Sequence, residues 1–125
     1  MRTVTSEISA CKQVIELWSL VRDLDVLGAY SGFELKTQAS GILGMDHYIA
    51  SCPCCEFDTK DCEGCPMHGF WRGDGIADGE CLGGIFGAWQ RARLYGERVA
   101  AAQELVEAAR EALAYWQAMR EMNQQ

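Results

Sequence analysis

The chain has 125 residues, of which 49% are hydrophobic, and its formal net charge is −7. This length fits one domain over residues 1–125, and the hydrophobic content excludes a disordered chain. No run of about 18 apolar residues is present, so we expect no helix that spans a membrane. Residues 1–9 lack the apolar core of a secretory signal, and we therefore expect a cytoplasmic protein.

The negative charge is concentrated in the middle of the chain. Between Asp46 and Glu80 there are eight acidic residues, and only Lys60 and Arg72 oppose them. From Gly83 to the end, five arginines balance five glutamates. Because phosphate backbones are bound mainly by Lys and Arg, the acidic middle argues against nucleic acid as a partner.

Residues 6–27 are expected to form an amphipathic helix. Apolar side chains recur there at spacings of three and four, as one helical face requires. Thr5 or Ser6 suits the start of this helix and Gly28 suits its end. Cys11 lies on the apolar face, where a cysteine most simply acts as a small buried hydrophobe.

Residues 28–84 contain most of the glycines and both prolines of the chain. Residues 33–39 within this region show no clear helical or strand period. A long segment without regular structure is uncommon in a compact domain unless something orders it. We therefore expect an irregular region that is ordered by a bound metal ion.

Residues 85–122 are expected to be helical, with a break or bend at Gly96. The positions from 97 to 121 keep the helical period and are rich in alanine, which favours a long helix. This helix is expected to pair with the first one, with Trp18 and Trp116 as core anchors. The alternative is that its end projects freely as an arm that binds a partner. The predicted fold class is mainly α, with two terminal helices flanking the irregular region.

The cysteines follow a C-x₂-C-x₆-C-x₂-C pattern, made by Cys52, Cys55, Cys62 and Cys65. Each C-x₂-C turn directs two sulfur atoms to one point, and two such turns supply the four tetrahedral ligands of Zn²⁺. In a reducing compartment, clustered cysteines indicate metal rather than disulfides. The spacer between the pairs is shorter than in common zinc ribbons, so one ligand can come from elsewhere. The reserve ligands are Cys81, His68 and Cys54.

Other chemistries for this cluster fit less well. An iron–sulfur site needs three closely spaced cysteines before the last ligand, and a thioredoxin-like site needs a βαβ setting. A catalytic zinc would need an open coordination position, with Glu56 or Glu63 as a base. Four available thiolates favour a closed structural site, so we identify no catalytic residues.

Two sets of residues are candidates for partner binding. The first lies in the acidic, glycine-rich region and consists of Asp58, Asp61, Glu63 and Trp71. The second is a small basic group beside aromatic residues, which nucleic acid can use. Its members are Arg91, Arg93 and Arg98. A solvated helix face is the more ordinary interpretation of this basic group.

The cysteine region resembles small, mostly uncharacterised cysteine-rich proteins of tailed bacteriophages. Those proteins show Cys-Pro-x-Cys-Glu-aromatic, then Cys-x-x-Cys-Pro, a further Cys, and an aromatic residue three positions before a Trp. The corresponding segments here are Cys52–Phe57, Cys62–Pro66, Cys81, and Phe86 with Trp89. This sequence departs from the pattern by carrying Cys54 inside the first pair, which leaves the ligand set open.

The resemblance implies a phage origin and a metal site whose ligands can include Cys81. Small acidic phage proteins often bind host machinery or host defence proteins, so the role follows by association. The leading hypothesis is a non-enzymatic, zinc-stabilised protein of the host cytoplasm that binds and inhibits a host or anti-phage defence protein. The alternatives are a nucleic-acid-binding zinc protein and a zinc-dependent hydrolase.

Overall fold

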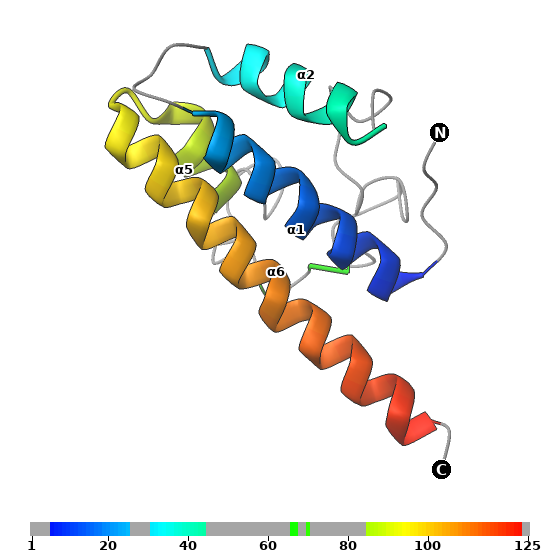
Figure 1. Ribbon diagram of the computed structural model, residues 1–125. Helices are drawn as coiled ribbons and strands as arrows, with labels where there is room; N and C mark the ends of the chain where they lie inside the picture. The colour runs from blue at the N-terminus through cyan, green and yellow to red at the C-terminus, as the bar shows by residue number, and fades with distance from the viewer. Residues whose placement is uncertain (1–5, 26–30, 45–65, 68–69, 71–84, 124–125) are drawn as a thin grey trace.

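The computed structural model describes residues 6–25, 31–44, 66–67, 70 and 85–123. In chain order, its elements are α1 (Glu7–Leu24), α2 (Gly32–Ile42), α5 (Ile85–Arg91) and α6 (Tyr95–Asn123). The described elements are all helices (Figure 1). This confirms the mainly helical class, with one helix near the N-terminus and a long helix at the C-terminus.

α1 begins at a reciprocal capping box. The backbone N–H of Ser9 donates to Oγ of Ser6, and the backbone N–H of Ser6 donates to Oγ of Ser9, each at 3.1 Å. Two backbone donors that a helix start leaves unpaired are satisfied in this way. The predicted end of this helix was too late, because α1 ends at Leu24 and Asp25 leaves helical geometry to pair with Arg98.

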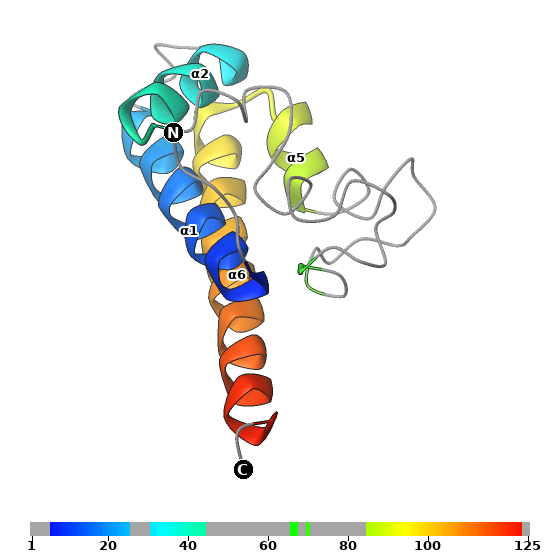
Figure 2. The same cartoon turned by 90° about the vertical axis from the view of Figure 1, so that its right-hand side faces the viewer.

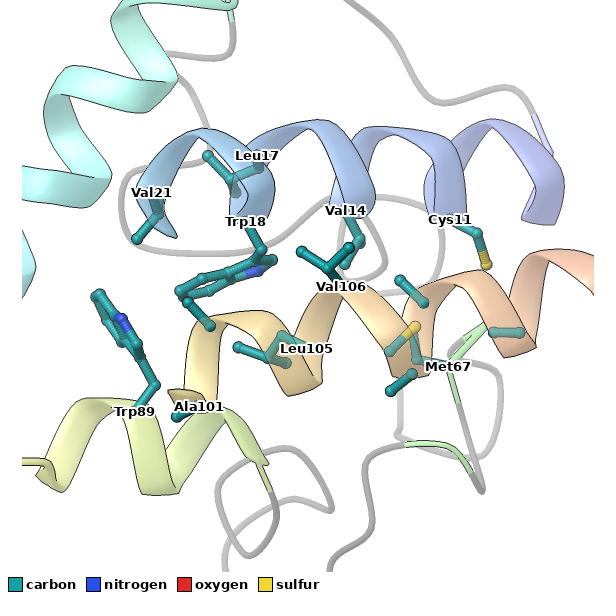
Figure 3. Packing of buried hydrophobic residues seen from close by; sticks show 14 of the residues in the cluster. Cys11, Val14, Leu17, Trp18, Val21, Met67, Trp89, Ala101, Leu105 and Val106 are labelled. Carbon is teal, nitrogen blue, oxygen red and sulfur yellow. The ribbon is translucent and has the colours of Figure 1, made fainter. Parts of the chain in front are cut away.

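α1 and α6 form the central pair of helices. They run antiparallel and lie side by side, and α6 continues well past the start of α1 (Figure 1). Between them lie fully buried side chains that include Val14 and Trp18 from α1 and Leu105 and Val106 from α6 (Figure 3). The predicted pairing of the two helices and the burial of Trp18 are confirmed.

α5 closes one side of this pair. Trp89 of α5 meets Trp18 edge to face, with ring centroids 4.7 Å apart (Figure 3). This geometry is favoured by the aromatic quadrupole. Gly32 of α2 lies so close to Trp89 that a methyl group in its place would be 3.2 Å from Cη2 of the ring.

α2 corrects the expectation that residues 33–39 are irregular. Oγ of Ser31 accepts the backbone N–H of Glu34 at 3.1 Å, which caps the helix start. Leu35 and Ala39, one helical turn apart, are fully buried. At the other end Gly44 adopts φ 72°, the left-handed conformation that commonly terminates helices. α2 is therefore stabilised by its cap and by two buried positions, and it has no long apolar row that a sequence pattern would detect.

The break between the last two helices also differs from the prediction. α5 ends at Arg91 and α6 begins at Tyr95, so Gly96 lies inside the first turn of α6 instead of at a break. The described part of the chain contains no helix with the length and apolar character needed to cross a bilayer.

Candidate metal centre and its attachment to the helices

The predicted metal ligands and acidic partner residues lie outside the described residues. The predicted ligands are Cys52, Cys55, Cys62 and Cys65, with Cys81, His68 and Cys54 as reserves. The predicted partner-binding residues are Asp58, Asp61, Glu63 and Trp71. Both sets remain predictions. Within the described ranges, no three His, Cys, Asp or Glu side chains gather to hold a metal ion. Cys11 is a buried thiol of the core, as the helical pattern predicted.

The described residues that follow the last predicted ligand are fixed to the helical core. Pro66 and Met67 are fully buried. The indole Nε1 of Trp116 on α6 donates a hydrogen bond of 2.8 Å to the carbonyl oxygen of Pro66. The backbone N–H of Phe70 donates to the carbonyl of Met67 at 2.8 Å, which closes a turn. We call Pro66, Met67 and Phe70 the anchor.

Aromatic rings on α6 extend this attachment. The ring of Phe70 lies 6.0 Å from that of Tyr115, and the ring of Tyr115 lies 5.1 Å from that of Trp116 in a T-shaped pair. Figure 3 shows Met67 pointing at α6 near the end of the core that holds Cys11, opposite the end that holds Trp89. Figure 2 shows the anchor beside the middle of α6, with the last turns of the helix continuing beyond it.

The anchor bears directly on the predicted zinc site through chain connectivity. Cys65 is the residue immediately before Pro66, and consecutive Cα atoms are separated by about 3.8 Å. The backbone on one side of the last predicted ligand is therefore held by buried contacts. The donor set of four thiolates is one that Zn²⁺ accepts, so the chemistry of the predicted ligands fits a structural zinc site.

The predicted basic group is divided by an ion pair. Nε and Nη2 of Arg98 donate to the two carboxylate oxygens of Asp25, each at 2.7 Å. The Asp25 side chain is 1% exposed. This hydrogen bonding raises the pKa of the Arg98 guanidinium, although burial alone would lower it. Arg98 therefore ties the end of α1 to the start of α6, which removes it from the candidate nucleic-acid surface.

One apolar row of α6 changes from buried to exposed along its length. Its members recur at alternating spacings of four and three: Ala101, Leu105, Ala108, Ala112, Tyr115, Met119 and Met122. The first four are buried, whereas Tyr115 is 48% exposed and Met122 is 67% exposed. A seven-residue repeat of this kind is typical of helices that pack against another helix.

Two functional contacts escaped prediction from the sequence. The bond from Trp116 to Pro66 joins residues 50 positions apart, and the pair of Asp25 and Arg98 joins residues 73 positions apart. No local spacing announces either of them. Pro66 directly follows a predicted cysteine ligand, and Asp25 and Arg98 lie near predicted helix ends, but nothing in the sequence pairs Pro66 with Trp116.

Comparisons with protein families, with curated proteins and with solved structures found no match to this chain. The fold and the site define it as a mainly helical protein in which a buried anchor joins a cysteine-rich segment to a long C-terminal helix.

Proposed function

We propose that this chain is a small, acidic, zinc-stabilised interaction protein of phage type that binds and inhibits a host or anti-phage defence protein. It is not an enzyme in this proposal. One zinc ion is held by Cys52, Cys55, Cys62 and Cys65, with Cys81, His68 and Cys54 as substitutes for one of them. The ion stabilises the cysteine-rich segment by joining its cysteines to one another, and the anchor joins that segment to the helical core.

The observation that carries the binding role is the exposed end of the α6 row. Tyr115, Met119 and Met122 continue a row whose earlier members are buried between helices. Large apolar side chains that remain exposed in such a row are a common feature of surfaces that accept a partner helix. Residues 113–125 carry one arginine and one glutamate, so this end is neutral in an otherwise acidic protein. Depletion of charge is typical of the centre of an interface.

The acidic residues of the middle region supply the second part of the proposed surface. Asp58, Asp61 and Glu63 carry negative charge, and Trp71 is an aromatic residue of the type that dominates binding energy at interfaces. Charges of one sign increase association rates with a basic partner surface and discourage nucleic acid. The proposed target therefore has a basic patch, and the protein competes there with the target's own acidic ligands.

Affinity capture from host cells tests the proposal. The wild-type chain should retain a host protein at a fixed stoichiometry. Met122→Glu should weaken that complex by about tenfold or more, because it places a charge in the apolar row. Gln117→Glu is the matched control, since it adds the same charge nearly half a turn around the helix. Retention of no host protein would contradict the proposal.

Charge reversal tests the acidic residues independently of the apolar row of α6. Asp58→Lys, Asp61→Lys and Glu63→Lys should each weaken the same complex, with a larger effect at low salt because exposed charges are screened by ions. A gel shift with nucleic acid at low salt should show no binding. Binding there would favour the nucleic-acid alternative.

A further inference from the structure

We infer that Trp116 is a positioning residue for the metal site: through the carbonyl oxygen of Pro66 it holds the backbone beside Cys65 against α6, so that metal binding and the seating of the anchor on α6 strengthen each other. This inference rests on the zinc site of the proposed function. It identifies Trp116, on α6, as the residue through which the helical core affects zinc affinity.

The contact is specific and partly buried. The hydrogen bond from Nε1 of Trp116 to the Pro66 oxygen measures 2.8 Å, and Pro66 and Met67 are fully buried. Loss of the donor would remove this bond from the carbonyl of a buried residue, which costs free energy. Met67 belongs to the same core cluster as Cys11 and Leu105, so the anchor is held by packing as well as by the hydrogen bond.

The connectivity makes this anchor relevant to the metal. Cys65 follows Cys62 in the second C-x₂-C pair and precedes Pro66 directly. A metal site rarely exists preformed in a free segment, so metal binding has to order its ligands. A ligand whose neighbour is already fixed loses less conformational freedom when it binds, which raises affinity. Trp116 therefore acts on the metal through the backbone and makes no metal contact itself.

The coupling must be reciprocal. If the seated anchor raises zinc affinity by some factor, bound zinc stabilises the seated anchor by the same factor. Zinc should then protect the Trp116 indole N–H from exchange with solvent. A purely structural tryptophan would gain only the protection that zinc gives to the whole fold, which the indole N–H of Trp89 measures.

The test compares zinc affinity in two tryptophan variants of the full chain. Trp116→Phe keeps an aromatic ring and removes the donor, and Trp89→Phe makes the same change at the opposite end of the core. Zinc affinity is measured by competition with a chelator at a temperature where circular dichroism shows both variants fully folded. Trp116→Phe should raise the zinc Kd about 2- to 10-fold, the equivalent of one hydrogen bond. Trp89→Phe should lower the unfolding temperature and leave the Kd unchanged.

Three results would overturn the inference. They are an unchanged Kd in Trp116→Phe, an equal rise in both variants, and no zinc binding by the wild-type chain. The third would also overturn the zinc site itself, so the two failures are distinguishable. If Trp116→Phe does not fold, indole N–H exchange in the wild-type chain decides. A zinc-dependent gain in protection that is larger for Trp116 than for Trp89 supports the coupling, and equal gains or no gain contradict it.

Discussion

The two halves of α6 have the same helical geometry and different surroundings. From Ala101 to Ala112, two adjacent rows of mostly small side chains are buried against α1, α5 and the core. From Tyr115 to Met122, the helix has passed the start of α1 (Figure 1) and carries aromatic and methionine side chains that are partly exposed. Small residues allow helices to approach closely, whereas the large exposed residues form the surface that we propose binds a partner.

The comparison teaches that one helix performs two separate tasks. Its first half stabilises the bundle, and its second half holds the anchor through Trp116 and presents Tyr115 and Met122. Substitutions in the first half should therefore change the free energy of unfolding, and substitutions on the exposed row of the second half should mainly change binding.

Trp18→Ala should have the largest effect on stability. Trp18 is fully buried where α1 meets the first half of α6, and its ring packs on Trp89. Removal should lower the free energy of unfolding by about 3–5 kcal/mol, measured by urea unfolding followed by circular dichroism. Tyr115→Ala in the second half should cost about 1 kcal/mol or less. Equal losses would contradict the division of α6 into two halves.

Asp25→Asn should lower the free energy of unfolding by about 2–3 kcal/mol, because the partly buried guanidinium of Arg98 then has a neutral and weaker partner. Arg22→Gln, which removes an exposed pair of 2.9 Å with Asp23 and a hydrogen bond to Gln103, should cost about 1 kcal/mol or less. Urea unfolding of both variants checks the order. A smaller loss for Asp25→Asn than for Arg22→Gln would show that the buried pair is not a main tie between α1 and α6.

The same pair predicts a flat pH dependence near neutrality. Its hydrogen bond raises the pKa of Arg98, so the folded state holds the guanidinium proton more tightly than the unfolded state. The stability that the raised pKa of Arg98 contributes is therefore fully present at neutral pH, and it is lost only as pH rises through the raised pKa. The loss in Asp25→Asn should be constant between about pH 6 and 9, a range well below guanidinium titration. If the loss of unfolding free energy in Asp25→Asn changed by more than about 1.4 kcal/mol across this pH range, which corresponds to one pKa unit, the prediction would be contradicted.

Ala109→Leu and Ala118→Leu compare the two halves by one identical change. Ala109 is fully buried in the first half, so the added atoms should cost about 1–3 kcal/mol through overpacking. Ala118 is exposed in the second half, and the same change there should alter stability by about 0.5 kcal/mol at most. Thermal unfolding of both variants measures the difference. Similar costs would mean that the end of α6 is packed as tightly as its start.

The smallest expected effect comes from two glycines. A methyl group at Gly96 would meet no heavy atom within 4 Å, so Gly96→Ala should stabilise the start of α6 by about 0.5–1 kcal/mol. At Gly32 the methyl group would lie 3.2 Å from Trp89, and Gly32→Ala should lose that gain. Thermal unfolding should rank Gly96→Ala above wild type and above Gly32→Ala. If Gly32→Ala were more stable than Gly96→Ala, the result would contradict the close approach of α2 to Trp89.

The helices that the sequence predicts well are those with long apolar rows. α1 and α6 each repeat apolar residues over many turns, so their periods are visible without tertiary information. α2 was missed because its apolar row is short, and the burial of Leu35 and Ala39 is a tertiary fact. Its cap is local, however, and the Ser31-x-x-Glu34 spacing was a signal in the sequence that could have located the helix start. The start of α6 was misplaced because Gly96 is tolerated within its first turn.

The candidate site divides in the same way. The cysteine pattern is local, so the sequence predicts it directly, although its residues lie outside the described part of the chain. The anchor depends on the contact of Trp116 with Pro66 across 50 residues, and only the folded arrangement reveals it. Trp116 was expected to be a core anchor, and it is instead a half-buried hydrogen-bond donor at the edge of the core.

Native mass spectrometry of the purified full-length chain, combined with elemental analysis, tests the central claim most directly. The account predicts one zinc ion for each chain, and it predicts that replacing both Cys52 and Cys65 with serine abolishes zinc binding while the helices remain. A chain that carries no stoichiometric metal, or whose clustered cysteines are joined to one another as disulfides, would contradict it.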